Sequence, residues 1–142
     1  MAGKGRSEQM NAVQSKVPQA LRKWFFIHFL VDFILAIPLM FAPVFFLSSL
    51  GWQVVDPVAS RLVAAALFGI GLKSLLSYKA TVETYQAMLN LKIIWSLAAI
   101  TGLILSLLQG NQGRPLALWM LLLVFIFFHA LWLYWKIKIS RL

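Results

Sequence analysis

The chain has 142 residues, of which 61% are hydrophobic and 12% are charged, with a formal net charge of +9 and no cysteine. Soluble domains average roughly 45–50% apolar and about 25% charged residues, so this composition excludes an ordinary soluble domain and indicates an integral membrane protein. The lack of cysteine excludes disulfide exchange, thiolate metal sites and lipid attachment through sulfur.

Four apolar blocks follow one another, each near or above the roughly 20 residues that a spanning helix needs. We expect a mobile cytoplasmic tail over residues 1–20 and one four-span domain over residues 21–142. The expected spans cover about residues 21–47, 57–78, 87–108 and 115–135. Lipid permits only helices or closed barrels to span, and the blocks lack strand-like alternation, so the predicted fold is an all-α four-helix membrane bundle.

The basic residues gather before the first block, between the second and third blocks, and after the fourth. Only Arg61 and Arg114 lie in or beside the other two loops. The positive-inside rule then predicts that both termini and the central loop are cytoplasmic. We attribute the positive charge to this orientation and to contact with anionic lipid heads, and not to a nucleic-acid partner.

The first block carries a histidine, an acid and a proline inside an apolar run. His28 and Asp32 are four residues apart, so they share one helical face. A carboxylate at the centre of a bilayer costs about 2.5–3.5 kcal/mol on insertion scales, so Asp32 should face protein, water or a ligand. Pro38 predicts a kink one turn beyond Asp32, and Pro43 predicts either a second bend or the exit from the membrane.

The second span is predicted to begin at Asp56 and Pro57, since aspartate caps free amides and proline suits the first helical position. Residues spaced by four then form a small and polar stripe, which we expect to face the bundle interior. The stripe consists of Arg61, Ala65, Gly69, Lys73 and Ser77. Lys73 is expected at a depth close to that of Asp32, so an Asp32–Lys73 ion pair is predicted.

The third helix is predicted to start at Thr81 as its N-cap, with Glu83 in the favourable first turn. Its first two turns, through Asn90, are polar, and Lys92 is expected to reach the interface with its flexible side chain. His129 interrupts the otherwise apolar fourth span. We therefore predict a polar pocket in the inner half of the bundle, formed by His28, Asp32, Lys73, Asn90 and His129.

The preferred functional hypothesis is a non-catalytic membrane subunit, an assembly factor or a hydrophobic-ligand-binding protein, because this class needs no motif that the chain lacks. Its expected partners are the lipid bilayer and either other transmembrane helices or further copies of the chain. A hydrophobic small molecule is the candidate ligand. We expect no resident cofactor or metal.

Three alternatives stay open. In helix count, and in an acid on the first helix, the chain resembles the small multidrug transporters, and this resemblance implies a proton- or cation-coupled carrier that uses Asp32 and works as a dimer. This chain is longer and has one strong orientation. A b-type haem could be held by His28 and His129, with Gly69 or Gly71 leaving room for the porphyrin. Lipid-modifying chemistry could instead use His28 and Asp32 as an acid–base pair.

Overall fold

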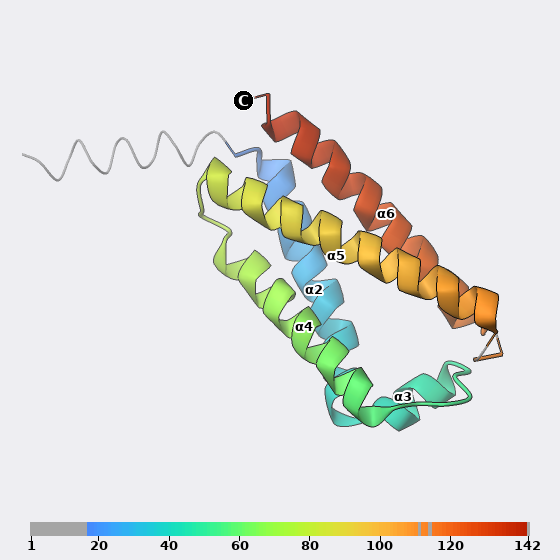
Figure 1. Cartoon of the computed structure of the whole chain (residues 1–142). Coiled ribbons are helices and arrows are strands. Elements are labelled where there is room, and N and C mark those ends of the chain that lie inside the picture. The colour runs from blue at the N-terminus through green and yellow to red at the C-terminus, as the bar shows by residue number, and fades with distance from the viewer. Residues whose placement is uncertain (1–16, 111, 114, 142) are drawn as a thin grey trace, which may run out of the picture.

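The computed structural model describes residues 17–110, 112–113 and 115–141, and all regular structure in these ranges is helical (Figure 1). The helices are α2 (Gln19–Phe41), α3 (Pro43–Ser49), α4 (Pro57–Leu76), α5 (Val82–Gln109) and α6 (Leu116–Ile139). All but α3 are long and apolar enough to span a membrane. This confirms the predicted all-α four-helix membrane bundle. Residues 1–16 of the predicted tail lie outside the described residues.

The first apolar block forms two helices and not a single span to Leu47. Helix α2 continues through Pro38 and ends at Phe41, and Pro43 opens α3 after a break at Ala42, which has φ −139° and ψ 53°. A residue before proline is disfavoured in the helical region, which explains the break at Ala42. The interruption therefore falls at the second proline, while a kink at Pro38 stays a prediction.

Local capping chemistry sets the starts of α4 and α5. The Asp56 side chain accepts hydrogen bonds from the backbone amides of Val58 (2.8 Å) and Ala59 (3.1 Å), which confirms the predicted helix start. Thr81 occupies the N-cap position of α5, as predicted, but its side chain makes no capping hydrogen bond. Glu83 lies in the first turn of α5, where its charge suits the helix dipole.

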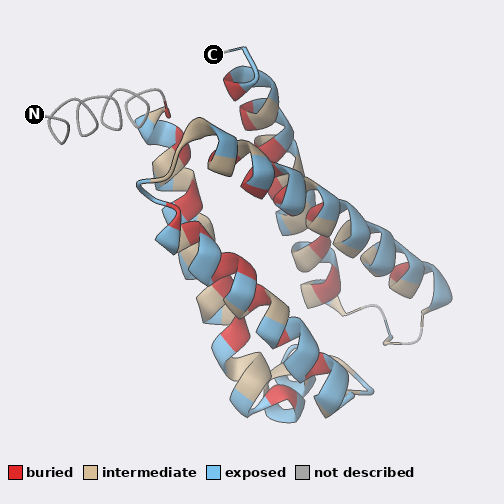
Figure 2. Cartoon of the chain, turned by 60° about the vertical axis from the view of Figure 1, so that its left-hand side comes forward, coloured by how far each residue is buried: buried red, intermediate tan, exposed pale blue. Residues whose placement is uncertain are grey.

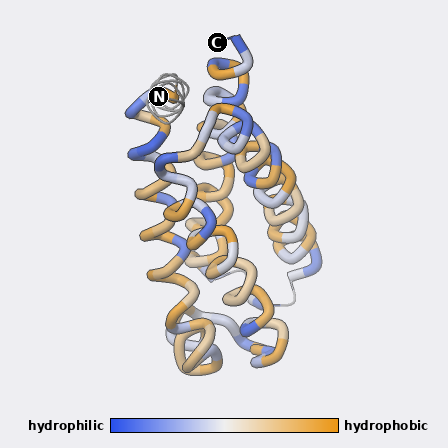
Figure 3. The backbone as a smooth tube through the Cα atoms, turned by 90° about the vertical axis from the view of Figure 1, so that its left-hand side faces the viewer, coloured by the Kyte–Doolittle hydropathy of each residue, from blue (hydrophilic) through white to orange (hydrophobic). Residues whose placement is uncertain are grey.

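The four spanning helices form two antiparallel pairs, α2 with α4 and α5 with α6 (Figure 1). The pairs lie close together at one end of the molecule and diverge toward the other, as Figures 1 and 2 show from two directions. We call the first the basic end, because hydrophilic residues gather there (Figure 3). Its cations include Arg22, Lys23, Lys79, Lys136 and Lys138. The opposite end, with α3 and the α5–α6 turn, is the loop end.

Contacts at both ends hold the two pairs together. At the basic end, α2, α5 and α6 share a buried hydrophobic cluster. Its members include Leu21, Phe25, Tyr85, Leu89, Trp132 and Trp135. At the loop end, Gln112 exchanges two side-chain hydrogen bonds with the backbone of Val54, at 3.1 and 3.0 Å. Between these two attachments, the helix pairs leave space in the middle of the bundle.

The rotation of α4 differs from the prediction. Of the stripe expected to face inward, Arg61, Ala65, Gly69 and Lys73 are exposed, and only Ser77 is buried. The buried face is shifted and consists of Ser60, Ala64, Leu67, Ile70, Gly71 and Ser74. This face is also rich in small residues, so it permits equally close packing against α2.

Candidate ligand-binding site

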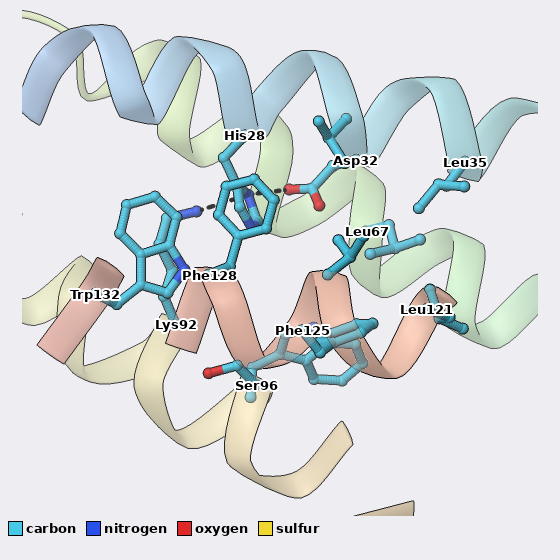
Figure 4. A pocket seen from close by; sticks show the side chains of 13 residues that line it. His28, Asp32, Leu35, Leu67, Lys92, Ser96, Leu121, Phe125, Phe128 and Trp132 are labelled. Carbon is cyan, nitrogen blue, oxygen red and sulfur yellow. Dashed lines mark hydrogen bonds and ion pairs between the residues drawn. The ribbon is translucent and has the colours of Figure 1, made fainter. Parts of the chain in front are cut away.

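A buried polar cluster lies within the membrane-spanning part of the bundle. His28 and Asp32 are one turn apart on α2, about 14 and 20 Å from its first residue at a rise of 1.5 Å per residue. Asp32 is 3% exposed, and Lys92 on α5 is 1% exposed. His28 Nδ1 lies 2.8 Å from Asp32 Oδ2 and 3.1 Å from Lys92 Nζ (Figure 4). One ring nitrogen thus lies between a buried anion and a buried cation.

This ring nitrogen cannot satisfy both neighbours. In a neutral imidazole, Nδ1 either donates or accepts, so it serves the carboxylate or the ammonium but not both together. Its 2.8 Å contact with Asp32 is that of an ion pair, and Asp32 Oδ2 makes no other contact with a hydrogen-bond donor among the described residues. A buried acceptor without a donor is destabilising by about 1–3 kcal/mol or more when charged. The cluster is therefore short of one donor beside Asp32.

Aromatic rings cover the cluster on the side of the basic end. Lys92 Nζ lies 5.1 Å from the ring centre of Phe25 and 5.0 Å from that of Trp132, within the range of cation–π attraction. The His28 ring packs edge-on against Phe128 and Trp132, with ring centres 4.8 and 5.1 Å apart. Phe25, Phe128 and Trp132 all belong to the buried cluster of the basic end. They separate the charged groups from water at that end.

Two adjoining spaces lie beside the cluster, and only the smaller one is lined by its polar residues. The first, which we call the polar chamber, has a volume of about 30 Å³, and His28, Asp32, Lys92 and Ser96 contribute its polar lining (Figure 4). The second, the apolar cavity, has a volume of about 420 Å³ and reaches toward the loop end. Ligand sites in proteins typically measure roughly 300–1,000 Å³. The two spaces share walls from all four long helices, including Val31, Leu35, Leu67, Trp95, Leu121 and Phe125.

The structure brings together only part of the predicted pocket. His28 and Asp32 meet as expected, but Lys73 and Asn90 are both exposed. Within the described part of the chain, Lys73 forms no ion pair with Asp32, because α4 turns its side chain outward. The buried lysine of the cluster is Lys92, which contacts His28 and not Asp32 directly.

The burial of Lys92 corrects its predicted interfacial position. Lys92 lies on the buried face of α5 with Tyr85, Met88, Leu89 and Ser96. These spacings of three, four and seven are those of one helical face. One sequence signal for this burial was missed. Lys92 and Ser96 are polar residues four positions apart on α5, the same spacing as His28 and Asp32 on α2.

His129 lies apart from the polar chamber. Its Nδ1 atom is 2.8 Å from Ser96 Oγ, in a contact that links α6 to α5. His28 lines the polar chamber and His129 does not. The space beside Gly71 is taken by Asp32, whose Cβ would lie 3.0 Å from a Cβ added to the glycine. These positions do not favour a haem between the two histidines, and haem binding stays an untested prediction.

Four apolar helices of spanning length, arranged around buried charged groups, define a small multi-pass membrane protein. Comparison of the chain with protein families, with curated proteins and with solved structures found no match.

Proposed function

We propose that this protein binds an amphipathic, membrane-soluble molecule. The apolar part of the ligand occupies the apolar cavity, and its polar end reaches the cluster of His28, Asp32 and Lys92. The observation that carries the proposal is that a ligand-sized apolar cavity adjoins a small chamber lined by Asp32, whose Oδ2 lacks a hydrogen-bond partner among the described residues. A site with apolar walls and a few converging polar groups is typical of small-molecule binding.

The route of entry favours a ligand from the bilayer over a solute from water. The aromatic cover separates the polar chamber from the basic end. In contrast, Ile34, Val63 and Met120 line the apolar cavity and are also 68%, 44% and 58% exposed. Residues that belong to both surfaces indicate that the cavity communicates with the acyl chains. A membrane-soluble molecule then enters between the helix pairs.

The proposal is a ligand-binding form of the non-catalytic class. It also accommodates a place in a larger membrane complex, because the outward faces of the long helices carry large exposed apolar side chains, such as Ile94 and Leu123. Such faces contact lipid, other transmembrane helices or a second copy of the chain.

The test is a cavity-filling substitution with a matched control on the same helix. Leu121 lines both spaces, whereas Leu123 is 64% exposed and lines neither. We expect dodecanol to remain bound to the wild-type protein when it is released from phosphatidylcholine nanodiscs and weighed by native mass spectrometry. Leu121→Trp should remove the bound dodecanol, and Leu123→Trp should retain it. Equal retention by both variants would contradict binding in the cavity.

A proton- or cation-coupled carrier is the second candidate, and the burial of Asp32 beside His28 and Lys92 favours it. Ionisable groups inside membrane helices commonly mark proton or ion pathways. Asp32→Asn should then abolish proton-driven uptake of a lipophilic cation into vesicles while the protein still elutes as a folded species. Uptake that survives this substitution would exclude the role of Asp32.

A further inference from the structure

We infer that the polar end of the ligand is a single uncharged hydroxyl group, so that the ligand is a long-chain or isoprenoid alcohol. This inference rests on the proposed binding function and names the ligand class for the same site. Three properties of the polar chamber lead to it: its size, its hydrogen-bonding groups and its balance of charge.

The size of the chamber limits the polar group. Its volume of about 30 Å³ is small beside the roughly 300–1,000 Å³ of typical ligand sites, so it favours a small polar group. A hydroxyl group fits this space, with the carbon chain leading into the apolar cavity. A phosphate or choline head has several more non-hydrogen atoms than a hydroxyl group, so the small chamber favours the hydroxyl.

The hydrogen-bonding groups require a donor and an acceptor on the same ligand atom. Asp32 Oδ2 is an acceptor that lies 2.8 Å from His28 Nδ1, a nitrogen that also contacts Lys92, and it has no other hydrogen-bond partner among the described residues. The Lys92 ammonium group has three hydrogens and can only donate. It lies 3.1 Å from His28 Nδ1, so hydrogens remain for a second acceptor. A hydroxyl group donates its hydrogen to Asp32 and accepts a hydrogen from Lys92. His28 Nδ1 can serve only one of its two neighbours in either tautomer, and the hydroxyl group serves the other.

The charges of the chamber favour a neutral ligand. Asp32 and Lys92 contribute one negative and one positive charge to the cluster. A carboxylate ligand would bring a second anion to Asp32, and an amine would bring a second cation to Lys92. Either would leave an unbalanced charge in hydrocarbon, which is strongly unfavourable. An alcohol adds no net charge.

The experiment compares ligands that share one carbon chain and differ at its end. Dodecanol, dodecane, terminally fluorinated dodecane and dodecyl phosphate are each added to wild-type protein in phosphatidylcholine nanodiscs. Bound ligand is counted by native mass spectrometry and corrected for partition into protein-free nanodiscs. We expect dodecanol to bind about tenfold more tightly than dodecane and the fluorinated chain, since only the hydroxyl supplies the missing donor. Dodecyl phosphate should show no binding above partition.

Two variants locate the preference in the chamber. Asp32→Ala should bind dodecanol and dodecane equally, because it removes the carboxylate that accepts a hydrogen bond from the ligand hydroxyl. Lys73→Met should keep the wild-type preference, because Lys73 is exposed and lies outside the chamber. The ligand series on wild-type protein stands without these variants if Asp32→Ala does not fold.

The outcomes separate the inference from the proposed function. Equal binding of dodecanol, dodecane and the fluorinated chain, lost in Leu121→Trp, would overturn the hydroxyl assignment and leave the cavity as an apolar ligand site. Tighter binding of dodecyl phosphate would also overturn it, in favour of an anionic head. Binding of no chain above partition would overturn both the assignment and the proposed function.

Discussion

At the scale of single residues, Lys92 is the side chain on which the polar cluster depends. Lys92 is 1% exposed, and its charge is compensated by three kinds of neighbour: the Asp32 charge, the His28 ring nitrogen and the faces of Phe25 and Trp132. Removing one partner of a buried charged pair leaves the other charge unpaired, and this is usually worse than removing both. Asp32 and Lys92 therefore stabilise the fold as a unit.

Lys92→Met should lower the free energy of unfolding by about 3–5 kcal/mol, because it leaves the Asp32 carboxylate without a nearby cation. Lys73→Met, the same exchange at an exposed lysine without an ion pair to Asp32, should change it by about 0.5 kcal/mol or less. Thermal unfolding in detergent, followed by tryptophan fluorescence, measures both. Similar losses in the two variants would show that Lys92 does not compensate Asp32.

The sequence predicted one half of this cluster. The contact between His28 and Asp32 follows from their spacing of four on one helix, which is a local property. The choice between Lys73 and Lys92 is not local, because each lies near a membrane boundary in the sequence and each has a side chain long enough to reach water. Packing of α5 against the aromatic rings of α2 and α6 decides that Lys92 is buried.

At the scale of elements, the approach of α4 to α2 depends on Gly71. A Cβ at this position would lie 3.0 Å from Asp32 Cβ and 3.3 Å from Asp32 Oδ2, whereas a Cβ at Gly69 would meet nothing within 4 Å. The two glycines lie on the same helix within one turn, so they form a matched pair.

Gly71→Ala should destabilise the protein by about 1–3 kcal/mol through crowding against Asp32. Gly69→Ala should be neutral or stabilise it by up to about 1 kcal/mol, since alanine favours the helix. Thermal unfolding of both variants in the same detergent provides the comparison. Equal behaviour of the two alanines would contradict the observed rotation of α4.

The start of α4 offers a second comparison between elements. Asp56→Ala should remove about 1 kcal/mol of stability, because two backbone amides lose their acceptor. Thr81→Ala should have a smaller effect, because the Thr81 side chain caps no amide of α5. The midpoints of thermal unfolding test the order, and a larger loss for Thr81→Ala would reverse this assignment of the caps.

The helix starts at Asp56 and Thr81 were predictable because N-capping depends on residues that are close together in the sequence. The rotation of α4 was not. Its sequence contains two small-residue faces, one through Ala65 and Gly69 and the other through Ala64 and Gly71. Only contacts with α2, distant in sequence, distinguish them.

At the scale of the whole molecule, the orientation across the membrane is an open prediction. The positive-inside rule places the basic end in the cytoplasm. Because the chain has no cysteine, single cysteines report accessibility without background. In intact cells, a membrane-impermeant maleimide should label Ser48→Cys at the loop end and leave Lys79→Cys at the basic end unlabelled until the membrane is opened. The reverse pattern would invert the orientation.

Hydropathy was sufficient to predict four spans, since burial in lipid depends mainly on each segment's own composition. It was not sufficient to predict that the helices pair as α2 with α4 and α5 with α6 and diverge between two attached ends. That arrangement arises from contacts such as Val54 with Gln112, which join residues far apart in the chain.

The apolar cavity of about 420 Å³ has a mechanical consequence. Hydrostatic pressure favours the state with less void volume. The protein should therefore unfold at lower pressure when the apolar cavity is empty than when a side chain or ligand fills it. Leu121→Trp, which plugs the void with its own side chain, should resist compression better than Leu123→Trp. Tryptophan fluorescence under pressure would thus detect the apolar cavity without knowledge of the ligand that occupies it.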